Sequence, residues 1–240
     1  MRVIGVPSAE ALATLAADAV ERCIAEKPGA VLALPTGKTP LGLYAELVRR
    51  AHGGAGALAQ ARIFNLDEYC GLPASDSASF AATLRRTLLD PLRMPAARVR
   101  LLDGAAVDLE EECRSYERAI ADAGGIDLCV LGVGVNGHIA FNEPGADWSL
   151  RTHLAELAPA TRAAFAAAHR GRPVPTHGLT LGIRTILEAR RVLLLIATSD
   201  KRAAALALRR GIADRAWPVS CLARQPHVVV MEPCGLACAP

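Results

Sequence analysis

The sequence predicts an α/β fold with a doubly wound, mostly parallel sheet and helices on both faces, in other words a three-layer α/β/α sandwich. Short apolar runs alternate along the chain with segments whose apolar residues recur every three or four positions. Runs that are apolar throughout are typical of strands buried on both faces, which need covering helices. With 240 residues, 52% of them hydrophobic, the chain fits one large domain, and we expect a single domain over residues 1–240.

The expected elements follow one another in strand–helix order from the amino terminus. A strand at residues 3–6 precedes Ser8, which is a favourable cap for a helix that continues until Pro28-Gly29. Residues 51–57, rich in alanine and glycine, are predicted to form a surface loop or helix end. Further strands are expected at residues 30–34, 62–66, 99–102, 126–131, 191–196 and 228–231, and further helices at residues 41–50, 79–89, 109–123 and 201–209.

Charge and composition exclude several classes of protein. Lys and Arg number 27 against 24 Asp and Glu, and no block of like charge indicates a nucleic-acid or membrane partner. No apolar run reaches the roughly 18 residues of a membrane helix, and the first residues lack a signal-peptide core, so we expect a cytoplasmic protein. The seven cysteines include no Cys-x-x-Cys pair, which favours reduced structural thiols over disulfides or a zinc site.

The first unusual junction is Leu34-Pro35-Thr36-Gly37-Lys38-Thr39-Pro40, between an expected strand and an expected helix. Free amide groups at the start of a helix favour an anion, so this junction suits a sugar phosphate. The Gly-Lys-Thr letters resemble the end of a nucleotide P-loop, but Leu32 stands where that motif needs its first glycine. The simpler alternative is a turn that only caps the helix.

The second junction places two adjacent acids, Asp67 and Glu68, at the end of an expected strand. A carboxylate shielded there can act as a base in proton abstraction. Successive residues of an extended chain face opposite sides, so the neighbouring acid must point elsewhere. The alternative for either acid is helix capping or a surface ion pair.

The third junction, Asn136-Gly137-His138-Ile139-Ala140-Phe141-Asn142-Glu143-Pro144, follows an apolar run and Gly132-Val133-Gly134. Its glycines have the spacing of the dinucleotide-binding pattern, but that pattern must open a helix. Pro144 and Gly145 would break such a helix, so the match does not indicate dinucleotide binding. Little side-chain bulk surrounds His138, and Glu143 is close enough in sequence for a hydrogen bond across the turn. The three junctions all lie at carboxyl ends of strands, where α/β sheets bind ligands.

These motifs give the chain a family resemblance. In order and spacing, residues 34–40, 64–73 and 137–144 resemble the glucosamine-6-phosphate deaminases, within the wider group of amino-sugar phosphate isomerases and 6-phosphogluconolactonases. The resemblance covers nearly the whole chain. Shorter matches lie at Arg151-Thr152 and at residues 174–175, 179–182, 201–203 and 217–222.

The resemblance implies an aldose–ketose isomerisation coupled to loss of the 2-amino group, which yields fructose 6-phosphate and ammonia without a metal or organic cofactor. His138 is then expected to move a proton during ring opening, with Asn136 and Glu143 orienting it. Asp67 is expected to move the C2 proton toward C1 through a cis-enolamine. The residues expected to hold the phosphate are Thr36, Gly37, Lys38, Thr39 and Lys201.

The sequence also departs from the family pattern. The position a few residues after Arg162 where relatives usually carry a phosphate-binding arginine lies in an alanine-rich stretch. Three alternatives follow: Arg170 or Arg172 substitutes for it, the phosphate is held less tightly, or the preferred sugar differs. Lys38, where relatives carry a small residue, either adds a phosphate contact or points to solvent. Ala146, His153 and Ala155 replace the serine, arginine and lysine of the allosteric site of regulated members. We therefore expect no activation by N-acetylglucosamine 6-phosphate.

Several alternatives stay open at this stage. Galactosamine 6-phosphate differs from glucosamine 6-phosphate only at C4, and no residue can be tied to that hydroxyl. A 6-phosphogluconolactonase-like hydrolase is disfavoured by the Asn-Glu-Pro continuation after the glycine–histidine pair. A non-catalytic sugar-phosphate sensor would carry a DNA-binding segment, for which an α/β pattern starting at residue 3 leaves no room. A homo-oligomer is compatible with the sequence, which does not fix the number of subunits.

Overall fold

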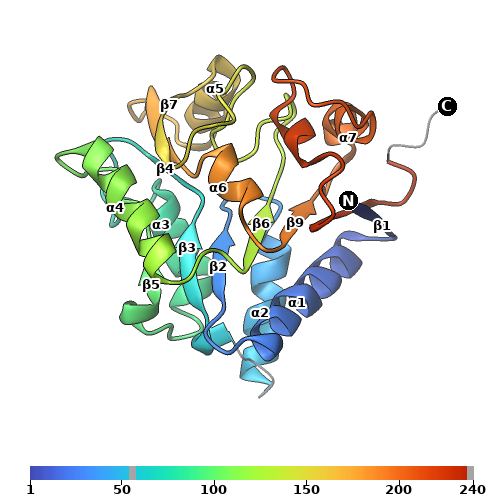
Figure 1. Cartoon of the computed structure of the whole chain (residues 1–240). Helices are drawn as coiled ribbons and strands as arrows, with labels where there is room; N and C mark the ends of the chain where they lie inside the picture. The colour runs from blue at the N-terminus through green and yellow to red at the C-terminus, as the bar shows by residue number, and fades with distance from the viewer. Residues whose placement is uncertain (54–57, 237–240) are drawn as a thin grey trace.

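A parallel seven-stranded sheet forms the centre of the protein, whose computed structural model describes residues 1–53 and 58–236 (Figure 1). The strand order is β1-β10-β9-β6-β2-β3-β5, and every pairing in this sheet is parallel. The strands are β1 (Arg2–Val6), β2 (Val31–Leu34), β3 (Arg62–Asn65), β5 (Val99–Arg100), β6 (Leu128–Leu131), β9 (Val192–Leu195) and β10 (Val228–Pro233). The predicted doubly wound sheet is therefore confirmed.

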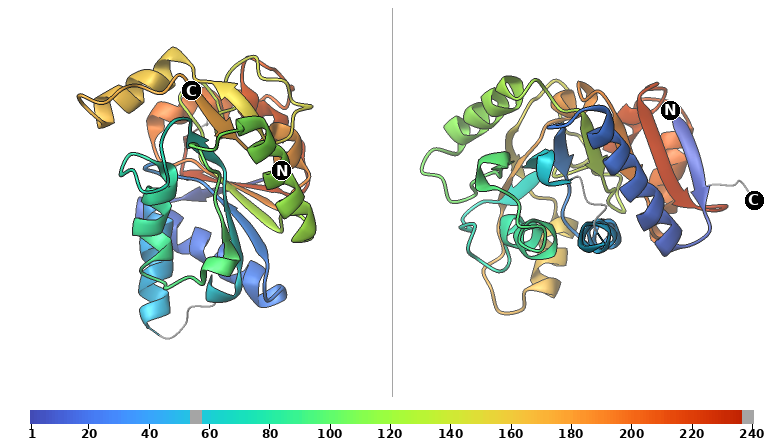
Figure 2. Two further views of the ribbon diagram at one scale, coloured as in Figure 1. Left: turned by 90° about the vertical axis from the view of Figure 1, so that its left-hand side faces the viewer. Right: turned by 90° about the horizontal axis from the view of Figure 1, so that it is seen from below.

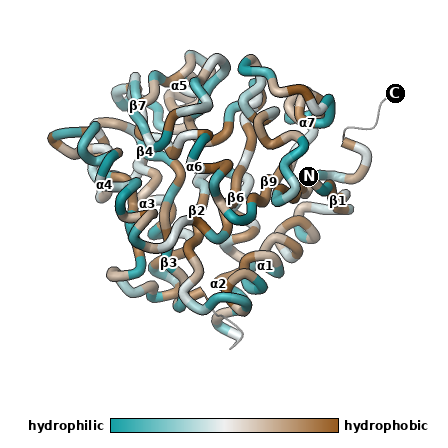
Figure 3. The backbone as a smooth tube through the Cα atoms, viewed as in Figure 1, coloured by the Kyte–Doolittle hydropathy of each residue, from teal (hydrophilic) through white to brown (hydrophobic). Residues whose placement is uncertain are grey.

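Alternate residues of each central strand enter two separate cores, one on each face of the sheet. In β2, Val31 and Ala33 pack in one core, and Leu32 and Leu34 in the other. The helices are α1 (Ala9–Glu26), α2 (Leu41–His52) and α3 (Phe80–Leu84) on the second face, and α4 (Leu109–Asp122), α6 (Ile183–Leu187) and α7 (Arg202–Arg209) on the first. Figure 2 shows helices on both sides of the sheet, and Figure 3 shows that the residues along β6 and β9 are hydrophobic.

A second, antiparallel sheet was not predicted. It consists of β4 (Asp67–Tyr69), β8 (His177–Thr180) and β7 (His153–Glu156), in the order β4-β8-β7. These strands and α5 (Pro159–Ala168) lie at the top of Figure 1, above β2 and β3. Their sequences are short, contain polar residues and have no apolar run, so no local pattern predicts them as strands. This small sheet places Asp67 over the edge of the large one.

The ends of the elements follow the local sequence closely, with a few corrections. The Ser8 hydroxyl accepts a hydrogen bond from Ala11 N at 3.2 Å, so the first helix starts where its cap predicts. The helix expected at residues 79–89 is an α-helical turn followed by a π-helix (Arg85–Leu89), and the strand expected at residues 99–102 is only two residues long. The helix expected from residue 201 begins at Arg202, after a 3-10 turn (Ser199–Lys201).

The surface loop or helix end predicted at residues 51–57 is described only in part. Residues 51 and 52 end α2, and residues 54–57 lie outside the described residues. Across residues 1–53 and 58–236, no helix combines the length and the apolar character that crossing a membrane requires.

Candidate active site

Four neighbouring strands bring the sequence motifs to one edge of the sheet. The strands β9, β6, β2 and β3 are adjacent and parallel, so their carboxyl ends share an edge. The 34–40 turn follows β2, the Asp67 segment follows β3, the His138 loop follows β6, and Lys201 follows β9. The site residues expected from sequence thus gather where α/β sheets bind ligands.

Two glycines make room for side chains at the His138 turn, Gly134 for the imidazole of His138 and Gly137 for Trp217. A Cβ atom on Gly134 would lie 2.3 Å from Cε1 of His138, so the ring rests directly on the backbone of that glycine. Gly137 has a φ of +82° and a Cβ there would lie 2.7 Å from Cε3 of Trp217. Gly134 N donates to His138 O at 2.9 Å, which closes the turn. The glycine pattern therefore serves a histidine turn and not a dinucleotide.

Glu143 is the centre of a polar network beside His138. Its Oε2 lies 3.3 Å from His138 Nδ1 and accepts a hydrogen bond from Asn136 Nδ2 at 2.9 Å. Its Oε1 accepts a hydrogen bond from the hydroxyl of Thr161. Burial by itself raises the pKa of Glu143, but the contacts with His138, Thr161 and Asn136 outweigh it and hold the pKa below its usual value.

Asn136 bonds to the backbone of His138 and to the carboxylate of Glu143, and not to the imidazole ring. Its Oδ1 accepts from His138 N at 3.2 Å, while its Nδ2 donates to Glu143. The orienting role expected for Asn136 therefore acts through Glu143. Thr161, on α5, was missed by sequence reasoning, because nothing in the letters of a helix eighteen residues downstream indicates a partner for Glu143.

Asp67 and Glu68 lie in opposite environments although they are adjacent. Glu68 accepts hydrogen bonds from Tyr69 N, Phe80 N and Ala81 N at 2.9, 2.9 and 2.7 Å, so it caps α3. Burial, partly offset by these bonds, raises the pKa of Glu68 to about 7. Asp67 is also buried, and its Oδ1 has no hydrogen-bond partner. Burial and the neighbouring charge of Glu68 raise the pKa of Asp67 to about 8.

The strand β8 ties Asp67 to the His138 loop. Asp67 pairs with Thr180 in the antiparallel register, and the Thr180 hydroxyl accepts a hydrogen bond from Phe141 N at 3.0 Å. One residue along, Asn142 Nδ2 donates to Leu181 O at 2.8 Å. Asp67 and His138 are not hydrogen-bonded to each other. The small sheet instead fixes the position of one relative to the other through buried, directional contacts.

The 34–40 turn has the features of an anion site. The Thr36 hydroxyl is buried without a hydrogen-bond partner, and Gly37 has a φ of +107°. The amino end of α2, which follows, has no side-chain cap, so its amide groups remain available to a ligand. Tyr44, buried in α2, donates a hydrogen bond back to Pro35 O and holds the turn in place. Lys38 is exposed and Thr39 half-buried.

Two further cations bear on anion binding. Lys201 Nζ lies 3.0 Å from Asp200 Oδ2, in the turn after β9. Arg172, a candidate substitute for the missing arginine, forms a bidentate pair with Asp76, with nitrogen–oxygen distances of 2.7 and 2.6 Å. The charge of Arg172 is therefore matched by a carboxylate within the protein. Within the part of the chain that the structure describes, no cluster of three or more His, Cys, Asp or Glu has the arrangement of a metal site.

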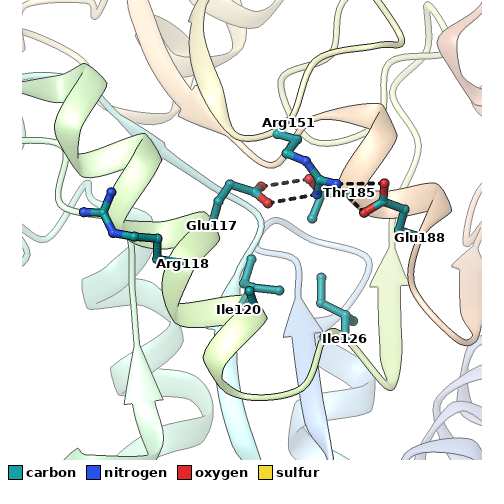
Figure 4. A pocket seen from close by; sticks show the side chains of 9 residues that line it. Glu117, Arg118, Ile120, Ile126, Arg151, Thr185 and Glu188 are labelled. Atoms are coloured by element: carbon teal, nitrogen blue, oxygen red, sulfur yellow. Dashed lines mark hydrogen bonds and ion pairs between the residues drawn. The ribbon is translucent and has the colours of Figure 1, made fainter.

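None of the site residues expected from the sequence lines either of two open hollows, of about 400 and 440 Å³. Figure 4 shows the first, between α4 and α6, where Ile120 and Ile126 lie below a row of polar groups. Arg151 lies between two acids there, 3.3 Å from Glu117 and 2.8 Å from Glu188. Its charge is matched by these carboxylates, so the family position at Arg151-Thr152 supports the fold rather than the anion site.

Comparison with known proteins shows the family of the chain. The model of the family described as glucosamine-6-phosphate isomerases/6-phosphogluconolactonase matches residues 7–231. The glucosamine-6-phosphate deaminase of Shouchella clausii is 41% identical over 232 residues, 96% of this chain and 94% of that protein. Its counterpart from Mycolicibacterium smegmatis is 42% identical over 233 residues, 96% of this chain and 89% of that protein.

Solved structures give the same result. A monomeric glucosamine-6-phosphate deaminase superposes with a TM-score of 0.94 at 37% identity, with 99% of each chain covered. A 6-phosphogluconolactonase from Thermotoga maritima superposes with a TM-score of 0.76 at 19% identity, over 97% of this chain and 98% of that one, and shares the fold alone. The chain belongs to the family of glucosamine-6-phosphate isomerases and 6-phosphogluconolactonases.

Proposed function

We propose that this protein converts glucosamine 6-phosphate and water to fructose 6-phosphate and ammonia. The observation that carries the proposal is the pairing of a buried carboxyl without a partner on Oδ1, Asp67, with a histidine held by a charged carboxylate, His138 beside Glu143. Isomerisation of a closed sugar needs both a proton shuttle for the ring and a base at C2. The names of the relatives point to the same reaction.

Ring opening is assigned to His138. Its Nδ1 faces Glu143, so Nε2 is the nitrogen available to take the proton of the O1 hydroxyl and return it to the ring oxygen O5. The negative charge of Glu143 stabilises the imidazolium that forms between these two transfers. Asn136 keeps Glu143 in place, and the product is the open-chain aldehyde.

Proton transfer between C2 and C1 is assigned to Asp67. The ionised carboxylate of Asp67 takes the C2 proton while O1 takes a proton from the 2-ammonium group of the substrate, which gives a cis-enolamine. Asp67 then returns its proton to C1, which leaves an iminium at C2. A pKa of about 8 makes the group a strong enough base to take a proton from carbon and a good enough acid to give it back. Water then adds to the C2 iminium, and ammonia leaves as the ketone forms.

Phosphate binding is assigned to the turn after β2 and to Lys201. The unpartnered Thr36 hydroxyl and the amide groups of Gly37, Lys38 and Thr39 offer donors to phosphate oxygens, in the manner of helix amino termini. The ammonium groups of Lys201 and Lys38 supply positive charge. All these residues come from one chain, so the proposed reaction does not need a second copy. We place it in the cytoplasm, consistent with the six free cysteines of the described residues.

A coupled ammonia-release assay tests the proposal. Glucosamine 6-phosphate, galactosamine 6-phosphate and 6-phosphogluconolactone are offered to the wild type, to Asp67→Asn and to His138→Gln. Ammonia and fructose 6-phosphate should form in equal amounts from glucosamine 6-phosphate, and both variants should be nearly inactive. Asp122→Asn and His52→Gln, which change exposed residues, serve as matched controls and should keep wild-type activity. Hydrolysis of the lactone without ammonia release, or undiminished turnover by either site variant, would refute it.

A further inference from the structure

The helix α5 contributes one polar side chain to the site network. Thr161 is only 8% exposed, and its hydroxyl donates to Oε1 of Glu143. Asn136 and His138 both contact the other oxygen, Oε2. The two oxygens of Glu143 are therefore held from opposite sides by different parts of the chain.

This division of contacts fixes the plane of the carboxylate. The last torsion of a glutamate side chain has a broad energy profile, so a carboxylate bonded on one oxygen can still rotate. A donor on Oε1 removes that freedom and keeps Oε2 directed at Nδ1 of His138, 3.3 Å away. The same hydrogen bond contributes to the lowered pKa of Glu143, after burial, which acts in the opposite direction, and His138.

Aromatic packing holds α5 in the position that this bond requires. Phe165 lies one helical turn after Thr161, so both side chains project from the same face of α5. The ring of Phe165 is 2% exposed and meets the ring of Tyr69 edge-on, with 4.9 Å between centroids and an interplanar angle of 75°. Tyr69 is two residues from Asp67 on β4. The helix that orients Glu143 thus packs against the strand that carries Asp67.

We propose that Thr161 is a positioning residue of the reaction, which holds the Glu143 carboxylate so that His138 is oriented for ring opening. This inference rests on the proposed function for its kinetic consequence, while the hydroxyl–carboxylate contact stands independently of it. The hydroxyl of Thr161 bonds to Glu143, and we assign it no contact with the sugar. The hydroxyl should therefore affect turnover and not substrate affinity.

The kinetic test compares Thr161→Val, which keeps the shape and removes the donor, with Thr161→Ser, which keeps the donor. Loss of one charge-assisted hydrogen bond corresponds to about a tenfold change, so kcat should fall about tenfold in Thr161→Val with KM within about twofold. Thr161→Ser should stay within about threefold of wild-type kcat. Equal kcat in wild type and Thr161→Val would overturn the proposal. So would equal losses in both variants, which would indicate a packing effect.

A titration without substrate separates this inference from the proposed function. The carboxyl carbon of Glu143 is followed by NMR as a function of pH in the wild type and both variants. Because the Thr161 bond lowers the pKa of Glu143, that pKa should rise in Thr161→Val and return toward the wild-type value in Thr161→Ser. An unmoved titration in Thr161→Val overturns the inference. If the wild type releases no ammonia, the proposed function fails, and the titration still decides whether Thr161 holds the Glu143 carboxylate.

Discussion

Asp67, which is buried, and Glu143, which is half-buried, are two carboxyls at the same edge of the sheet, and their surroundings are opposite. Oδ1 of Asp67 has no hydrogen-bond partner, and burial with the nearby charge of Glu68 raises its pKa to about 8. Both oxygens of Glu143 are bonded, and its pKa stays below the usual value although burial opposes this. Because the two pKa values are shifted in opposite directions, Asp67 is suited to carrying a proton and Glu143 to remaining charged.

Glu68 shows that burial alone does not make a carboxyl a proton carrier. It follows Asp67 directly and is the more buried of the two, at 1% exposed against 8%. Yet three backbone amides bond to it, which commits it to capping α3. The difference between the two acids is a difference in partners, and substitutions of the site residues can test it.

The largest effect is expected for Asp67→Asn. An amide keeps the shape but can neither take nor return a proton, and loss of a positioned base costs on the order of 10²–10⁴ in rate. We expect kcat for ammonia release to fall at least about 10³-fold, with KM within about threefold. A variant with more than a tenth of wild-type kcat would show that Asp67 does not carry the proton.

A smaller loss is expected for Glu143→Gln. The amide still accepts from one neighbour but cannot balance the charge of a protonated His138, so kcat should fall about 30-fold, comparable to the loss of one or two charge-assisted contacts. Steady-state kinetics at several pH values measure this. A loss as large as that of Asp67→Asn would mean that Glu143 transfers a proton itself, and the contrast between the two carboxyls would not hold.

A change in a cation that contacts neither carboxyl should alter affinity and leave proton transfer intact. Lys201→Met should raise KM about tenfold at nearly constant kcat, because it removes a charge from the proposed phosphate site. Arg172→Met is the matched comparison, since the Arg172 guanidinium is already paired with Asp76, and KM should stay within about twofold. The reverse ranking would place the phosphate near Arg172.

The smallest effect concerns stability, and its sign differs between the carboxyls. The raised pKa of Asp67 means that the folded protein holds a proton that the unfolded chain releases, so stability falls as pH rises from about 4 to about 8. Asp67→Asn removes the free-energy cost of ionising a buried carboxyl at high pH. The variant should therefore have a Tm at least about 3 °C above wild type at pH 9, and the difference should vanish near pH 4.

The lowered pKa of Glu143 acts in the opposite sense. Its stabilising contribution is present above the unfolded pKa and is lost as pH falls through the lower folded value. Glu143→Gln should therefore lower Tm at neutral pH, and the deficit should shrink below about pH 4. Differential scanning calorimetry across this range measures both variants. Two variants with shifts of the same sign at pH 9 would contradict the opposite surroundings of the two carboxyls.

Local patterns in the sequence predicted most of the large sheet and the three motifs at its edge. Apolar runs identify buried strands because each such run must be covered on both faces, and Ser8 identifies a helix start because its hydroxyl satisfies a free amide. The 132–144 segment predicts a turn and not a dinucleotide site because Pro144 and Gly145 break a helix, and the structure adds that the ring of His138 rests on Gly134. The site residues drawn from the resemblance all lie at the expected edge, while their catalytic roles stay predictions.

What the sequence could not predict depends on partners far away in the chain. In the antiparallel sheet, the pairing of β4 with β8 joins segments more than a hundred residues apart, and no local periodicity encodes that pairing. The sequence Asp67-Glu68 does not predict which acid caps a helix, because the answer depends on which side chain reaches the amides of Phe80 and Ala81 in the folded protein. Thr161 is an ordinary helix residue until folding brings it to Glu143.

The amino-acid order by itself determined which side chains could do chemistry and at which strand ends they would lie, because hydrophobic periodicity and turn residues act over a few positions. Only the tertiary structure decided the protonation behaviour of those side chains. The pKa of a carboxyl depends on how much water, which donors and which charges surround it, and here these surroundings come from strands and helices distant in sequence.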